Sequence, residues 1–132
     1  MVEDMLVGNS LTSEMITSGK ELITILDKKN FLIKAALWIY FPDNLYWILL
    51  IGIPGLDTKG PKKAYKSLFP ILHQNPDLNL SLMNIKLIDS SDDFISLLRT
   101  AINTGEGISG IRFTRNIING FLIEDAYIYR LI

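Results

Sequence analysis

One group of residues in the last third of the chain has side chains that could bind an anion or a polar partner. Its members alternate along two segments separated by Asn119-Gly120: Arg112, Thr114, Asn116, Asp125, Tyr127 and Tyr129. An arginine, a carboxylate and two phenols brought together can hold such a ligand by charge-assisted hydrogen bonds. The competing interpretation is the solvated face of an antiparallel sheet, which the alternation of side chains alone would produce.

A second candidate site is a basic group made of Lys59, Lys62, Lys63 and Lys66. The group surrounds Pro61, a residue suited to the first position of a helix. Positive charge at that end opposes the helix dipole, which favours anions there, so the placement suggests anion binding. A nucleotide P-loop is not predicted, because Pro61 replaces its lysine. A solvated lysine face, or a weak surface for an acidic partner, is the plainer interpretation.

No constellation in the sequence predicts catalysis or a metal site. His73 is the only histidine, and the nearest carboxylate in sequence is Asp77, in a loop. Asp89, Asp92 and Asp93 lie close together, but the start of a helix explains them without a metal. The chain has no cysteine, which excludes disulfides, thiolate metal sites and cysteine nucleophiles. We expect no catalytic residue, no metal and no cofactor.

These side chains need a scaffold, and the strongest structural pattern in the chain is the segment Ile33 to Ile53. Two apolar runs rich in β-formers flank Pro42-Asp43-Asn44, a pattern typical of a β-hairpin. A three-residue loop would pair Phe41 with Leu45. Both faces of this hairpin are mostly apolar, so we expect both to be largely covered.

The predicted register gathers a third candidate site on one face of this hairpin: Trp38, Tyr40, Tyr46, Ile48 and Leu50. A helix could cover these side chains. Alternatively, three modest helices would leave part of the set exposed, and an exposed aromatic patch would mark a self-association interface. The sequence leaves both interpretations open.

The first helix is predicted from Thr12 or Ser13 to about Lys28, on a stripe of apolar side chains at helical spacing. A capping-box pattern beginning at Ser18 leaves a later start open.

Three elements separate the first hairpin from the second. A helix beginning at Pro61 should kink or stop near Phe69, because Pro70 cannot donate a backbone hydrogen bond. Residues 80–88 are predicted to form a strand. Residues 89–93 then open a third helix, with acidic side chains at its positive end.

The second hairpin is predicted from Asn119-Gly120, because a type I′ turn needs positive φ at both central residues. This turn pairs Ile118 with Phe121 and places Arg115 opposite Glu124. We predict a partly buried ion pair, since its neighbours on that face are apolar.

These elements predict an α+β fold with the order α-β-β-α-β-α-β-β. The sheet is expected to be mixed, mainly antiparallel and five-stranded, with three helices. Residues 1–10 should be a flexible arm and residues 11–132 a single domain. The formal net charge of −1 gives no drive toward nucleic acid. No apolar stretch is long enough to span a membrane.

The sequence predicts a non-enzymatic protein-interaction domain that self-associates, as a homodimer, in the cytoplasm. The alternative is a ligand-binding protein or enzyme that acts on a phosphorylated or nucleic-acid substrate. That alternative requires the basic group and Arg112 to line one concave pocket. We expect no membrane partner and no nucleic-acid partner under the first interpretation.

Overall fold

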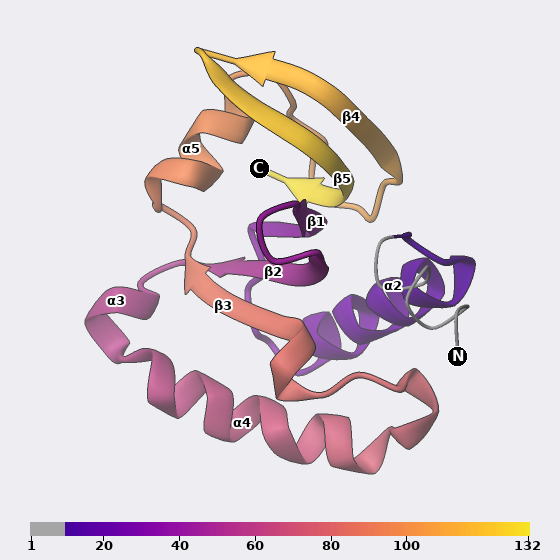
Figure 1. Cartoon of the computed structure of the whole chain (residues 1–132). Coiled ribbons are helices and arrows are strands. Elements are labelled where there is room, and N and C mark those ends of the chain that lie inside the picture. The colour runs from indigo at the N-terminus through magenta and orange to yellow at the C-terminus, as the bar shows by residue number, and fades with distance from the viewer. Residues whose placement is uncertain (1–9) are drawn as a thin grey trace.

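The protein has an α+β fold, seen in a computed structural model that describes residues 10–132 (Figure 1). Within that range five strands form one sheet with the spatial order β3-β2-β1-β5-β4. β2 and β3 run parallel, and the other neighbouring strands are antiparallel. The expected mixed sheet is therefore confirmed. The strands are β1 (Ala35–Phe41), β2 (Tyr46–Ile53), β3 (Ile85–Asp89), β4 (Ile111–Ile118) and β5 (Phe121–Leu131).

Four helices accompany the sheet in the described residues: α2 (Ser13–Lys28), α3 (Leu56–Lys59), α4 (Pro61–Gln74) and α5 (Asp93–Arg99). α2 has the earlier of the two predicted starts, because the Thr12 hydroxyl accepts a hydrogen bond from the Met15 N–H at 3.1 Å. α3, a single turn, was not predicted. The expected arm, residues 1–10, lies outside the described residues apart from Ser10.

Two predicted boundaries, the stop of the second helix near Phe69 and the start of the third strand at residue 80, are wrong. α4 continues through Pro70 to Gln74, because the residues that follow the proline, Ile71 and Leu72, are buried against the core. Burial of this apolar face outweighs the backbone bond that the proline cannot make. The third strand is shorter than residues 80–88. Within the first part of the predicted range the chain forms a 3₁₀ turn, Leu82–Asn84, which the Ser81 hydroxyl caps.

Two hydrophobic clusters lie on the two faces of the sheet. The first contains side chains of α2 and α4, such as Leu22 and Leu68, packed on the sheet. The second contains Ile95 and Leu98 of α5 together with residues of β1, β2, β4 and β5. Figure 1 shows α2 and α4 on one side of the central strands and α5 on the other. Both faces are thus covered, but the α5 face is covered by a helix of only two turns.

The register of the first hairpin differs from the predicted one by one residue. Phe41 pairs with Tyr46 rather than with Leu45, so the turn holds four residues. Leu45, the last residue of the turn, takes the left-handed conformation, with φ 55°. A shift of one residue turns every side chain of β2 to the other face. Trp47 and Leu49, not Ile48, therefore lie on the Trp38 face.

The second hairpin has the predicted register, with Ile118 opposite Phe121 and Thr114 opposite Asp125. The pairing is interrupted at Arg115, whose φ is 48°. Beyond this kink the two faces exchange. Ile118 and Ile123 turn into the α5-side cluster, although simple alternation would place them with Thr114 and Asp125.

A bulge in β5 sets the end of the chain against α2. Ala36 pairs with Arg130, but the next residue, Leu37, pairs with Ile128, so Tyr129 is the extra residue. Tyr129 and Arg130 consequently both face α2. The Tyr129 hydroxyl donates to the Ile16 carbonyl oxygen at 2.6 Å.

Candidate functional site

Polar side chains on one face of the second hairpin form hydrogen bonds with one another. Two nitrogens of Arg112 donate to the two carboxylate oxygens of Asp125, both at 2.7 Å, and the Thr114 hydroxyl donates to the same carboxylate at 3.2 Å. The Arg112 guanidinium also lies 5.8 Å from the centre of the Trp47 ring. The hydrogen bond to Asp125 raises the pKa of Arg112. Its preferred partner is therefore already in place within the chain.

The two tyrosines expected on this face do not extend it. Tyr129 is 1% exposed, and its hydroxyl accepts a hydrogen bond from Trp38 Nε1 at 3.1 Å. Burial raises the pKa of the Tyr129 phenol. Tyr127 is half-buried and packs edge-on against Tyr129, with ring centres 5.3 Å apart. Tyr129 is therefore a core residue and not part of the exposed polar face. Asn116 remains exposed and donates to the Thr114 carbonyl oxygen.

The aromatic set proposed for self-association does not form one surface either. Trp38 is 1% exposed and lies under α2, where its Nε1 also donates to the Met15 carbonyl oxygen. Ile48 and Leu50 lie on the opposite, α5-side face and are also buried. The prediction of one shared face is wrong because it rested on the register that the four-residue turn overturns. Tyr46 alone of the five is exposed.

An apolar groove of about 400 Å³ nevertheless opens on the α5 side, and we call it the hairpin-end groove. It lies between the β1–β2 turn (residues 41–43), the tip of the second hairpin (residues 121–124) and the first residues of α5. Ile39 and Leu50 also line it, as do Tyr40 and Lys86.

Exposed apolar side chains gather around the ends of the two hairpins that flank this groove. The large hydrophobic residues exposed there are Leu45, Tyr46, Ile117, Phe121 and Leu122. Three phenylalanines that line the groove pair with other rings: Phe41 with Tyr46 at 6.0 Å, and Phe94 with Phe121 at 5.8 Å between ring centres. Ile117 and Leu122 are exposed because the kink at Arg115 turns them outward.

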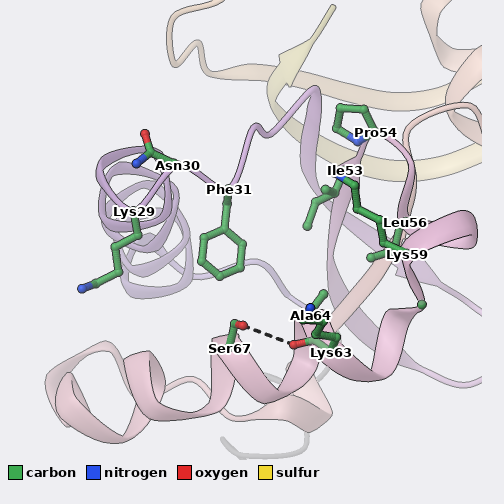
Figure 2. Close-up of a pocket in the computed structure, with 11 residues that line it drawn as sticks. Lys29, Asn30, Phe31, Ile53, Pro54, Leu56, Lys59, Lys63, Ala64 and Ser67 are labelled. Atoms are coloured by element: carbon green, nitrogen blue, oxygen red, sulfur yellow. Dashed lines mark hydrogen bonds between the residues drawn. The ribbon is translucent and has the colours of Figure 1, made fainter.

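A second pocket, which we call the lysine-rimmed pocket, lies between the end of α2, the end of β2 and the start of α4 (Figure 2). Its volume is about 300 Å³. Lys29, Lys59 and Lys63 line it, together with Phe31 and other apolar side chains. Figure 2 shows the Phe31 ring directed toward α4, and the Lys29 ammonium directed outward.

The basic group predicted from the sequence is divided by this geometry. Lys59 and Lys63 line the pocket, whereas Lys62 and Lys66 are exposed and do not. Arg112 does not line it either, because it lies on β4, the strand at one edge of the sheet, while α4 contacts β3 at the other edge. The requirement that the basic group and Arg112 share one pocket is therefore not met.

The acidic residues after β3 have structural partners. The Asp89 carboxylate accepts hydrogen bonds from the N–H of Asp57 at 3.0 Å and from the N–H and hydroxyl of Ser91. These bonds, that of Asp57 first, lower the pKa of Asp89. The Asp92 side chain caps α5 by accepting from the Phe94 N–H. No cluster of three or more possible metal ligands occurs among residues 10–132.

Sequence reasoning missed the ion pair between Asp27 of α2 and Arg130 of β5. Arg130 is buried and also donates to the carbonyl oxygens of Gly107 and Ile33. The signal in the sequence is an arginine inside the apolar run that ends the chain, since a charge there needs a partner. Its partner, 103 residues away, cannot be read from local pattern.

Comparisons with known proteins add no functional assignment: no family model, no curated protein and no solved structure matches the chain. In the part of the chain that the structure describes, no helix has the length and apolar character needed to cross a membrane.

Proposed function

We propose that the protein is a non-enzymatic interaction domain that self-associates through the hairpin-end groove. One observation carries the proposal. Five large apolar side chains are exposed at the two hairpin ends, beside a mainly apolar groove whose lining includes Phe41, Phe94 and Phe121. Large exposed apolar side chains that gather beside a groove often mark a binding surface. Aromatic side chains are also enriched in the cores of protein interfaces.

The occupant that we propose is a second copy of the chain. The hairpin tip projects Phe121 and Leu122, which are 52% and 54% exposed, at the border of the groove. One protomer can thus supply the apolar projection and its partner the apolar groove. In a two-fold dimer each protomer inserts its hairpin tip into the groove of the other. The contact is therefore closed and self-complementary.

The charges around the groove suit a self-complementary contact. Lys86, Asp43, Asp92 and Glu124 line it, and Arg115 extends from the adjacent kink with its side chain 79% exposed. Both signs are present on one surface, so a two-fold axis can bring the cations of one copy near the carboxylates of the other. Arg115 is free to move to such a partner, because its contact with Glu124 is long, at 3.5 Å, and exposed.

Analytical ultracentrifugation over a range from nanomolar to high micromolar protein tests this proposal. We expect a concentration-dependent dimer. Ile117→Lys should shift the dimer toward monomer, because it places a charge on a side chain that is 70% exposed and contributes nothing to the core. Phe121→Ser is a second disruptive change at the same tip.

Phe69→Ser is the matched control. Phe69 is 56% exposed, close to the value for Phe121, but it lies on α4 on the other side of the sheet. It should leave the dimer intact. A wild-type chain that stays monomeric at every concentration would remove the proposal, as would equal dissociation of the Phe69 and Phe121 variants.

The proposed compartment is the cytoplasm, and its support is compositional. The chain has no cysteine, so its stability owes nothing to an oxidising environment.

A further inference from the structure

We infer that the lysine-rimmed pocket binds a small organic anion that combines an apolar body with a doubly charged head, of the class of aryl or alkyl phosphate monoesters. The pocket shares no lining residue with the hairpin-end groove, so this inference stands or falls independently of self-association.

Charge is the first reason. Three lysines and no carboxylate line the pocket, and the ammonium of one of them, Lys29, is directed away from its interior (Figure 2). Within residues 10–132 none of the three forms an ion pair, whereas Arg112, Arg115 and Arg130 each have an acidic partner. Positive charges on a concave, apolar wall strengthen the local electrostatic potential, which favours binding of an anion.

The start of α4 adds to the same potential. Gly60 is its N-cap and provides no side-chain hydrogen bond, and the first turn contains no acidic residue. Backbone N–H groups at this end therefore have no capping side chain, and the positive end of the helix dipole is not neutralised from within the helix. Lysines in this position destabilise the helix by a small amount when no anion is present. With an anion bound at this helix end, the same lysines would stabilise the helix.

The apolar wall determines what else the ligand must have. Phe31, Ile53, Pro54 and Leu56 line the pocket beside the lysines (Figure 2). Leu56 is buried, while Phe31 is only half-buried and leaves part of its ring open to a ligand. A free inorganic ion would leave this surface in contact with water. A ligand with an apolar body would cover it and gain the free energy of that burial.

The position in the sheet is a third reason. β2 and β3 are the parallel pair, joined through α3 and α4, and the pocket lies where the chain leaves β2 at Ile53 and Pro54. Crevices outside the carboxyl ends of parallel strands are the usual ligand sites of such units. The volume of about 300 Å³ is at the lower end for small-molecule sites, which limits the body to one or two rings or a short chain.

Calorimetric titration with three probes tests the inference on the full-length chain. 1-Naphthyl phosphate has both the ring and the dianion, 1-naphthol only the ring, and inorganic phosphate only the charge. We expect the ester to bind most tightly, by about tenfold or more over each of the others, and to weaken with added salt. Equal affinity for the ester and naphthol, or no heat from the ester at millimolar concentration, would overturn the inference.

A pair of double variants locates the site. Lys59→Gln with Lys63→Gln removes two charges that line the pocket. Lys62→Gln with Lys66→Gln removes two charges from the same region of the chain that do not. The first should weaken binding of 1-naphthyl phosphate by about tenfold, and the second by less than about twofold. All four lysines are exposed, so both proteins should keep the wild-type circular dichroism spectrum. Equal weakening by the two would show a diffuse attraction to positive charge and would contradict the assignment.

Discussion

Asp27 and Arg130 form a two-pronged ion pair in which both nitrogen–oxygen distances are 2.9 Å. The pair connects the last turn of α2 to the end of β5. The Arg130 side chain is 7% exposed and that of Asp27 is 36% exposed. The arginine is therefore the member that depends on the pair, since it has little water to replace its partner.

Asp27→Asn should destabilise the protein by about 2–4 kcal/mol, because it leaves a buried guanidinium without its counter-charge. The value is below that for a fully buried pair because water reaches the carboxylate. Urea unfolding at neutral pH measures the change. Asp125→Asn is the control. It breaks a pair whose arginine side chain is 50% exposed, so it should cost only about 0–1 kcal/mol. If the two variants are equally stable, the contacts of Arg130 with backbone carbonyls already hold it in place.

Gly19→Ala should destabilise the protein although alanine is the better helix former by about 1 kcal/mol. A Cβ at Gly19 would collide with the Tyr129 hydroxyl and lie 2.8 Å from Trp38 Nε1. The expected net loss is about 1–3 kcal/mol in the free energy of unfolding. Thr17→Ala, at an exposed position of the same helix, should cause little change.

The double variant with Tyr129→Phe isolates the cause of that loss. Removing the hydroxyl makes room for the new methyl group, so the two changes should cost less together than their sum. Strict additivity would mean that α2 moves away from the sheet instead of meeting the hydroxyl.

Asp89→Asn should lower the free energy of unfolding at neutral pH. It should also make that free energy depend less on pH in the acid range. Hydrogen bonds from Asp57 and Ser91 hold the pKa of the folded Asp89 below its usual value of about 3.9. A lowered pKa in the folded state contributes stability above the unfolded pKa, and that contribution is lost as pH falls through the folded pKa. The stability curves of the wild type and the variant should therefore converge below about pH 4. A constant gap between pH 2 and pH 7 would show that the charge of Asp89 is not involved.

Local pattern predicts the second hairpin better than the first, and the reason is physical. Asn119-Gly120 allows one tight turn, so Ile118 and Phe121 must pair, as they do. The first turn has no such constraint. Both faces of β1 and β2 are apolar, so alternation does not distinguish a three-residue loop from the observed four-residue loop. That single ambiguity placed Ile48 and Leu50 on the wrong face of the sheet.

The ion pair at Arg115 shows a second limit of sequence reasoning. The predicted partner is correct, because Arg115 and Glu124 lie 3.5 Å apart. Its predicted partial burial is wrong for Arg115, whose side chain is 79% exposed. A left-handed residue within a strand is rarely visible in sequence unless it is glycine or asparagine. Local reasoning likewise could not place Lys29, the C-cap of α2, in the same pocket lining as Lys59 and Lys63.

The kink at Arg115 also interrupts one edge of the sheet. β4 is an edge strand of eight residues, and an unbroken edge of that length can template one chain after another into a growing fibril. Arg115 interrupts the regular pairing with only Ile111 to Thr114 before it and Asn116 to Ile118 after it. The longer piece has four residues, below the usual strand length of about five to six. The backbone at Arg115 therefore disfavours strand addition at the β4 edge, whereas the contacts proposed for the hairpin tip use side chains and can close on themselves.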